Sequence, residues 1–307
     1  MIIKKEKKGN ITIYYLDKDI DDEKMDKLQN TRVKRDQIKL IIDDDADVYN
    51  KDNQLLLRFR KKKLTNENIR DFYDNIIQFA MKKTNNRGSA SASKKKNIYD
   101  NDPIMSNIIG YFDKLSPMHK YLARKKNKKI ELYVRETRFN AEYPEKFKKL
   151  IPLIKEIDSY YKKFIPEKYL KQRRKANQTP FKITGTSFTT ITTNVNFQTS
   201  IHKDAGDDPE GFGNLVVIED GKYSGGETCL PQYGVGVDVR TGDILFMDVH
   251  EWHGNLPIKL ETPDAKRLSI VCYLRHKIWE KTKNKTKKFM ERHNKTLKSL
   301  KKTETDK

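Results

Sequence analysis

The chain is poor in cysteine, with only Cys229 and Cys272 among its 307 residues. Two cysteines do not make a disulfide framework, and their spacing fits no metal-binding motif. The sequence therefore predicts a reducing, intracellular compartment, with the nucleus left open. Long apolar runs are also missing. None approaches the roughly 20 residues that cross a bilayer, and no apolar run with a cleavage site follows Met1, so we expect no membrane contact and no secretory signal.

Apolar residues are scarce: 36% of the chain is hydrophobic and 35% is charged. This composition excludes a membrane protein but is not polar enough for wholesale disorder. The length allows one large domain, or a domain with a sizeable appendage.

Positive charge dominates, with a net charge of +21, but it is unevenly placed. Between Ile183 and Pro263 there are 4 basic and 12 acidic residues, so this segment is net acidic. The excess of Lys and Arg lies at 58–63, at 124–129, at 168–175 and in the C-terminal tail. Either a lysine-rich composition fills solvent-facing positions, or the surface attracts a polyanion such as nucleic acid.

The first part of the chain, residues 1–86, is expected to be a small α/β appendage of unknown role. Alternating and apolar runs predict strands at 11–15 and 55–59, and apolar residues at helical spacing predict a helix at 69–81. Residues 87–98 are small, polar and basic, which is typical of a linker.

The main domain is expected at residues 99–275. It begins with a mostly helical part, in which Pro144 starts an amphipathic helix that reaches Tyr161. From residue 183 the sequence pattern changes to short runs of Thr, Val, Ile and Phe between turns that contain Gly, Asp and Pro. This pattern predicts a jelly roll or a barrel. The candidate strands are 188–193, 215–218, 235–239, 244–247 and 268–273.

The last part, residues 276–307, is a lysine-rich helical tail. Its few apolar residues, chiefly Trp279, Phe289 and Leu297, suggest no apolar face wide enough to require burial. We expect the tail to remain on the surface, where it could follow a phosphate backbone.

A metal site is suggested by His202-Lys-Asp204. Residues two apart on an extended strand point to the same side, so an imidazole and a carboxylate meet. A second histidine from a later strand would complete the two-histidine, one-carboxylate set that binds Fe(II) and leaves positions open. His250 and His253 are both candidates, and a lone histidine of either kind is more often a satisfied loop residue.

Arg267 stands on the next apolar strand, with Ser269 on the same face. A guanidinium fork binds a carboxylate in bidentate fashion and a hydroxyl adds a further bond, so the pair could receive the distal carboxylate of 2-oxoglutarate. The alternative is a surface arginine at a strand edge.

Five motifs together carry a resemblance. They are His202-Lys-Asp-Ala-Gly-Asp, Tyr223-Ser-Gly-Gly-Glu-Thr-Cys-Leu-Pro-Gln-Tyr, Gly242-Asp-Ile-Leu-Phe-Met-Asp, Trp252-His-Gly-Asn and Arg267-Leu-Ser-Ile-Val-Cys-Tyr. As an ordered set they resemble the TET/JBP family of Fe(II)- and 2-oxoglutarate-dependent DNA-base hydroxylases, over about residues 135–275. The resemblance implies an α+β fold, with a double-stranded β-helix (jelly-roll) oxygenase core at 183–275, flanking helices and the N-terminal appendage.

The resemblance also implies roles for single residues. The metal ligands would be His202, Asp204 and His253, because the family places the last ligand about eleven residues after the glycine that matches Gly242; His250 would be a neighbour. The family further implies O2 as a substrate, with Arg267 and Ser269 gripping 2-oxoglutarate.

Tyr273 matches an aromatic position that packs on a flipped base, although ordinary core packing explains it equally well. Arg275 stands where the TET branch has a histidine, and it fits the thymine-hydroxylase branch better. Asn194 and Asn196 could bond the co-substrate or substrate, and Asn196 is our candidate for the co-substrate; such residues more often cap strands and turns.

The sequence thus predicts a dioxygenase that hydroxylates the methyl group of thymine or 5-methylcytosine in DNA. No protein partner is evident. Two alternatives stay open. One is a hydroxylase of proteins or small molecules on the same fold, because fold does not fix substrate. The other is a non-catalytic DNA-binding protein with a degenerate oxygenase fold, which the intact ligand set argues against.

Overall fold

The computed structural model describes residues 1–85, 92 and 104–302. The linker predicted at 87–98 lies outside these residues, apart from Ala92. Among the described helices, none is both long and apolar enough to span a bilayer.

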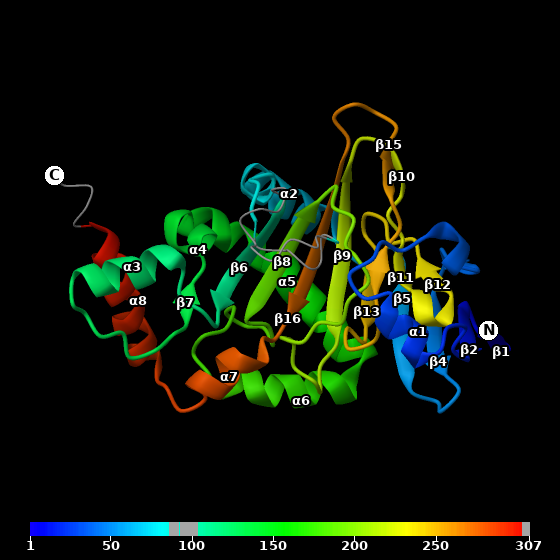
Figure 1. Cartoon of the computed structure of the whole chain (residues 1–307), viewed down its shortest axis with the longest axis horizontal. Coiled ribbons are helices and arrows are strands. Elements are labelled where there is room, and N and C mark those ends of the chain that lie inside the picture. The colour runs from blue at the N-terminus through cyan, green and yellow to red at the C-terminus, as the bar shows by residue number, and fades with distance from the viewer. Residues whose placement is uncertain (86–91, 93–103, 303–307) are drawn as a thin grey trace.

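A large sheet crosses the molecule (Figure 1), and ten strands of the described residues belong to it. In spatial order these are β1 (Ile2–Lys8), β2 (Ile11–Leu16), β4 (Ala46–Asn50), β5 (Leu55–Arg60), β13 (Ile244–Met247), β9 (Gly213–Asp220), β16 (Lys266–Tyr273), β8 (Thr190–Val195), β6 (Ser106–Phe112) and β7 (Arg135–Glu136). Neighbouring strands run antiparallel, except for the parallel pair β2 and β4.

A smaller four-stranded sheet faces one end of the large one. Its order is β14 (Gly254–Asn255), β11 (Thr228–Leu230), β12 (Val235–Val237) and β3 (Leu40–Ile42). Buried side chains of both sheets form one apolar cluster, for example Val235 and Val237 against Leu57 and Leu245. A separate ribbon of β10 (Tyr223–Gly225) and β15 (Ile258–Leu260) projects beyond the sheets (Figure 1).

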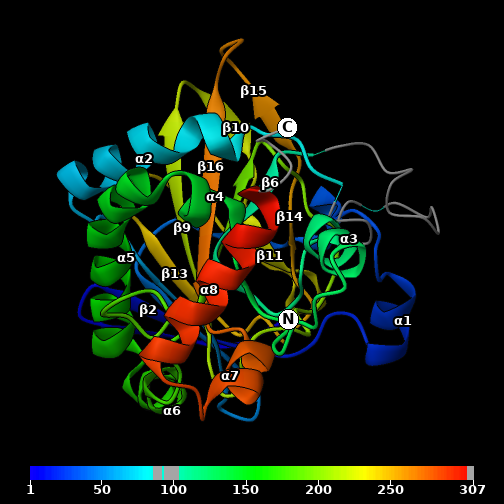
Figure 2. The ribbon, with the colours of Figure 1, turned by 90° about the vertical axis from the view of Figure 1, so that its left-hand side faces the viewer.

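Helices cover the opposite face of the large sheet. Figure 2 shows α2, α5 and α6 along that side, and α7 and α8 at the end nearest the viewer. The helices are α1 (Asp22–Lys27), α2 (Asn66–Ala80), α3 (Pro117–Lys125), α4 (Arg138–Glu142), α5 (Pro144–Phe164), α6 (Pro166–Asn177), α7 (His276–Thr282) and α8 (Lys287–Lys302), with short 3-10 turns at Arg35–Gln37 and Pro231–Tyr233.

The amphipathic patterns explain this packing. In α5, Pro144 occupies the first turn, where its missing N–H costs no hydrogen bond. Leu150, Leu153, Ile154 and Ile157 are then fully buried along one side. They join apolar residues of α2 and of the central strands in a single cluster, so the helical layer and the sheet share one core.

The predicted helices at 69–81 and 144–161 are confirmed, and so are the strands at 11–15, 55–59, 215–218, 244–247 and 268–273. One stretch differs from expectation, because β6 is a strand of the large sheet inside the part predicted to be mostly helical. The α+β class holds. Strands of the first 86 residues enter both sheets, since β5 pairs with β13 and β3 pairs with β12. The division between appendage and main domain stays a prediction.

The expectation that the C-terminal helix needs no burial is wrong. Leu297 and Leu300 of α8 are 4% and 0% exposed, and they pack with Leu122 of α3 and with Leu115 just before it. His293 is also buried, and its Nε2 lies 2.7 Å from the carbonyl oxygen of Val134. Lysines dominate the composition of this helix, but a narrow stripe of buried side chains at helical spacing is enough to dock it.

Candidate functional site

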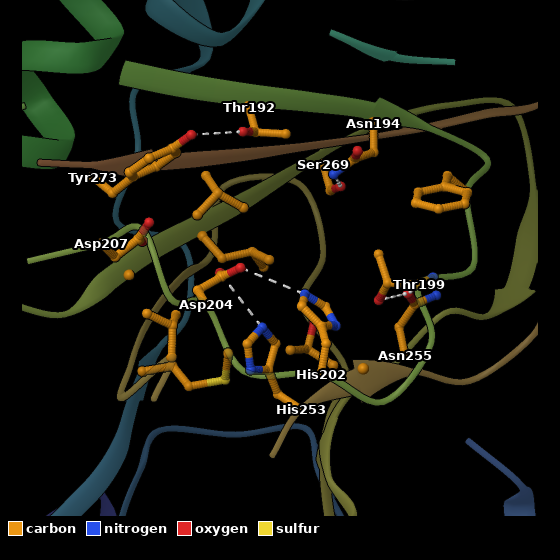
Figure 3. Close-up of a pocket in the computed structure, with 18 of the residues that line it drawn as sticks. Thr192, Asn194, Thr199, His202, Asp204, Asp207, His253, Asn255, Ser269 and Tyr273 are labelled. Atoms are coloured by element: carbon orange, nitrogen blue, oxygen red, sulfur yellow. Dashed lines mark hydrogen bonds and ion pairs between the residues drawn. The ribbon is translucent and has the colours of Figure 1, made fainter. Parts of the chain in front are cut away.

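One pocket lies between the two sheets, and it collects most of the residues singled out in the sequence (Figure 3). Its volume is about 130 Å³, roughly ten times the minimum that holds one water molecule. Of the predicted site residues it is lined by His202, Asp204, His253, Arg267, Ser269, Tyr273 and Arg275. Asn196 is not among the lining residues.

Three of these side chains point at one spot. A ligand atom each from His202, Asp204 and His253 lies within 4.8 Å of the other two. The Asp204 carboxylate sits 3.6 Å from Nε2 of each histidine, which is too long for hydrogen bonds. Figure 3 shows the carboxylate facing both imidazoles. This spacing leaves room for an ion held by all three groups, and the donor set suits Fe(II).

The backbone holds both imidazoles in the orientation that a metal needs. His202 and His253 exchange backbone hydrogen bonds of 2.9 Å, which places one ring beside the other with centroids 4.3 Å apart. Nδ1 of His202 lies 2.7 Å from the Ser200 carbonyl, and Nδ1 of His253 lies 2.9 Å from the Glu251 carbonyl. An Nδ1–H that donates to a carbonyl leaves the Nε2 lone pair for a metal.

His250 is directed elsewhere. Its Nδ1 contacts the Asp248 carboxylate at 3.1 Å, and that hydrogen bond raises the pKa of His250. The geometry therefore favours His253 over His250 as the third ligand. The strand assumed for His202 and Asp204 is reduced to a single bridge between His202 and His253, yet the two side chains still converge.

Arg267 is a buried cation whose charge no described carboxylate balances. Its side chain is 4% exposed, and within the described part of the chain no carboxylate lies at ion-pair distance and Nε has no hydrogen-bond partner. Burial lowers the pKa of the guanidinium. Gly226, at φ +78°, makes room for it, because an added Cβ would meet Nε at 2.9 Å. An unpaired buried charge is costly, so this site is built for an anion.

Ser269 and Asn194 lie beside Arg267 in the pocket. The Asn194 amide donates to Oγ of Ser269 at 3.4 Å and accepts from Oγ of Ser106 at 2.6 Å. Asn196 is occupied outside the pocket: its amide oxygen accepts the Arg267 backbone N–H at 2.7 Å and its amide nitrogen donates to the Ala265 carbonyl. Asn196 therefore fixes the start of β16, and it does not line the pocket in which 2-oxoglutarate was expected.

Tyr273 and Arg275 close the other end of the pocket. The Tyr273 hydroxyl is 3.2 Å from Oγ1 of Thr192, and the ring is 7% exposed. Arg275 forms an ion pair with Asp113 and stacks on Phe112, 4.5 Å from the ring centroid. The pocket is thus acidic and histidine-bearing in the middle, with an arginine at each end.

Sequence reasoning missed several lining or supporting residues. Asp207 lines the pocket and lies three residues after Asp204 in the motif already quoted, so that motif could have indicated it. Asn255 also lines it and ends the quoted Trp252-His-Gly-Asn motif, whereas Phe197 and Thr199 line it without any recognisable pattern. Asp113 carries no motif either, and only the pairing of β6 with β8 brings it to this end of the site.

Comparison with known proteins agrees with this geometry. Residues 116–276, just over half of the chain, match Tet_JBP, the oxygenase domain of the 2OGFeDO superfamily. The chain belongs to the Tet_JBP family. Membership in the superfamily implies Fe(II), 2-oxoglutarate and O2 in general terms, and the donor set and the unpaired Arg267 fit that implication.

Among curated relatives of this Tet_JBP chain, thymine dioxygenase JBP1-A of Trypanosoma cruzi (strain CL Brener) is 34% identical over 191 residues, covering 61% of this chain and 21% of that protein. Thymine dioxygenase JBP1 of Trypanosoma brucei brucei is 32% identical over 177 residues, covering 57% and 20%. The chain spans about a fifth of the length of these relatives.

Among solved structures, NgTET1 in complex with 5mC DNA covers 93% of this chain and 90% of its own, with a TM-score of 0.54 and 15% identity. At that identity the likeness establishes a shared fold, and it says nothing about the base that this chain uses.

Proposed function

We propose that this Tet_JBP chain is a dioxygenase that hydroxylates the methyl group of thymine in DNA. The observation that carries the proposal is the pocket itself, where a two-histidine, one-carboxylate set stands between an unpaired buried arginine and an aromatic end. His202, Asp204 and His253 would hold Fe(II), and Arg267 with Ser269 would hold the distal carboxylate of 2-oxoglutarate. Fe(II) with 2-oxoglutarate and O2 supplies the oxidising power that converts a methyl C–H bond to an alcohol.

The chain's own residues supply orientation and a dry site. Backbone carbonyls fix both imidazoles, and an anion would give Arg267 the counter-charge that no carboxylate of the described residues supplies at ion-pair distance. Arg267 and Ser269 are 4% and 5% exposed, so a ligand held there is shielded from water. Shielding strengthens each electrostatic contact in the pocket.

The surface charge supports a nucleic-acid substrate. The net charge of +21 is carried outside the acidic segment around the pocket, on helices such as α6 and α8. Those lysines and arginines would bind phosphates while the target base leaves the duplex, at a cost of a few kcal/mol. We propose thymine rather than 5-methylcytosine as the substrate because the curated relatives are thymine dioxygenases and because Arg275 lines the end of the pocket.

We also infer that residues 183–275 form the core of a double-stranded β-helix. The large sheet and the four-stranded sheet face each other across the pocket, which supports that arrangement. The same proposal includes the domain limits at residues 86 and 275. It also includes an intracellular location and DNA as the partner.

The test is to incubate the purified protein with Fe(II), 2-oxoglutarate and duplexes that contain thymine or 5-methylcytosine, then to digest the DNA and analyse the nucleosides by mass spectrometry. We expect 5-hydroxymethyluracil and an equal amount of succinate. Detection of 5-hydroxymethylcytosine alone would show that 5-methylcytosine, and not thymine, is the substrate. Succinate without any modified nucleoside would point instead to a protein or small-molecule hydroxylase, and absence of succinate would leave a DNA-binding protein.

A further inference from the structure

Arg275 is held on three sides. One face of its guanidinium lies over the Phe112 ring, and its Nη1 lies against Gly206, where an added Cβ would approach within 2.4 Å. Its Nε–H donates to Oδ1 of Asp113. The side chain is 18% exposed and lines the pocket, so its orientation is fixed and its Nη groups are the donors that it offers to a ligand.

Asp113 is anchored as firmly as the arginine that it holds. It follows β6 directly, and its side chain is 1% exposed. Its backbone carbonyl accepts a hydrogen bond of 2.7 Å from Nζ of Lys281 in α7. Strand β6 and helix α7 therefore hold the backbone of Asp113 from two sides, and Arg275 precedes α7 as its N-cap residue.

The ion pair decides what Arg275 can bind. The guanidinium of Arg275 keeps its positive charge, but the ion pair with the buried Asp113 carboxylate holds it in one orientation. What it offers to the pocket is a fixed set of N–H donors, which suits an acceptor such as a base carbonyl. The position fits as well, because Arg275 and Asp204 line the same pocket and the polar group at C4 of a pyrimidine is next to the methyl-bearing C5.

We propose that Asp113 is a positioning residue that holds Arg275 against the C4 substituent of the bound base, so that the site accepts a C4 carbonyl and rejects a C4 amine. Thymine carries the carbonyl and 5-methylcytosine carries the amine, so the Asp113–Arg275 pair sets the choice between them. With the amine, donor faces donor and the hydrogen bonds of Arg275 are left unmade. This inference rests on the proposed function.

The test compares kcat/KM for thymine and 5-methylcytosine duplexes in Asp113→Ala, Asp113→Asn, Arg275→Ala and the double variant Asp113→Ala/Arg275→Ala. Arg275→Ala should lower the preference for thymine by about 10- to 100-fold. Asp113→Ala should act in the same direction, and Asp113→Asn should retain part of the preference because its amide oxygen still accepts from Nε. In the double variant the loss should equal that of Arg275→Ala alone, since Asp113 acts through Arg275.

Two readouts separate positioning from structural damage. Asp113→Asn should recover part of the thymine preference that Asp113→Ala loses, whereas a merely structural defect would leave both variants equally impaired. A matched control is Asp47→Asn, which weakens a buried carboxylate pair with Arg58 and Arg60 outside the pocket and should leave the base preference as it is. The salt dependence of DNA binding should also be unchanged in Arg275→Ala.

Several results would overturn the proposal. A salt slope reduced by about 0.9 in Arg275→Ala would identify a phosphate contact. Additive losses in the double variant would show that Asp113 acts independently of Arg275. A wild-type protein that hydroxylates thymine, with variants that keep its base preference, would refute this inference alone. A wild-type protein that makes succinate but modifies no base would refute the proposed function and this inference together.

Discussion

Arg267 and Arg60 offer a sharp comparison, because both residues are about 4% exposed but only Arg60, of these two, has a carboxylate at ion-pair distance. Arg60 donates to the carbonyl of Ala46 at 3.0 Å and pairs with Asp47 at 2.8 Å. Arg267 has neither a carboxylate nor a partner for Nε among the described residues. Replacing each by Met, which has a similar length and no charge, should therefore have opposite consequences.

For Arg60→Met we expect the free energy of unfolding to fall by about 1–3 kcal/mol, because buried partners lose their hydrogen bonds. For Arg267→Met the protein without ligand should be at least as stable as wild type, because an uncompensated buried charge has been removed. The 2-oxoglutarate affinity should behave the other way. Removing a charge-assisted interaction worth about 1.5–3 kcal/mol weakens binding by roughly 10- to 150-fold, while Arg60→Met leaves it unchanged.

The assay is thermal or denaturant unfolding with metal present and oxygen excluded, with and without 2-oxoglutarate. At a concentration 100 times the wild-type Kd, the ligand should stabilise wild type by about 2.7 kcal/mol and a 100-fold weaker variant by only about 0.4 kcal/mol. Steady-state succinate formation should show a raised KM for 2-oxoglutarate in Arg267→Met, with metal binding retained. An unchanged KM, or a full ligand shift in Arg267→Met, would refute the role assigned to Arg267.

Three further predictions follow from the same structure. Alanine at any position of the metal triad should abolish succinate formation, whereas His250→Ala should leave measurable turnover; loss of metal binding in His250→Ala would show that the wrong histidine was chosen. Replacing the exposed charges of α8 by Gln, at Lys288, Arg292 and Lys295, should weaken DNA binding equally for all sequences and reduce the log–log salt slope by about 0.9 for each phosphate that the helix no longer neutralises; an unchanged slope would mean that α8 does not touch DNA. Leu300→Ala should destabilise the protein by about 2–5 kcal/mol in denaturant unfolding, and a decrease below about 0.5 kcal/mol would contradict the docked helix.

Local pattern was enough to find many of the elements and the candidate metal ligands. Apolar spacing located α2 and α5, and the side chains of His202 and Asp204 did converge, although His202 alone of the two takes part in an isolated bridge. Asn196 shows where pattern fails. Its place just before the metal residues suggested a ligand contact, but its positive φ of 48° and its two backbone hydrogen bonds turn the amide toward β16.

Long-range pairing could not be predicted from any local window. Asp113 meets Arg275 only because β6 lies beside β8, and β8 beside β16. Likewise, the composition of α8 suggested a solvated helix, yet Leu297 and Leu300 find a complementary apolar surface beside α3. Such packing depends on the register of strands that are far apart in the chain, which is set by the whole packed core.

The pairing of β5 with β13 has a consequence for synthesis of the chain. Strand β5 pairs with β4 on one side and with β13 on the other, and because Ile244 pairs with Arg60, about 180 residues must follow β5 before β13 exists. At roughly 5–20 residues per second, β5 is made about 10–40 seconds before this second partner strand. Its apolar residues Leu56, Leu57 and Phe59, all nearly fully buried in the finished protein, lack the part of their cluster that later strands supply during that interval. The early strands should therefore be the part of the nascent chain most in need of a chaperone, and the pocket can form only after the last strand of the sheet has been made.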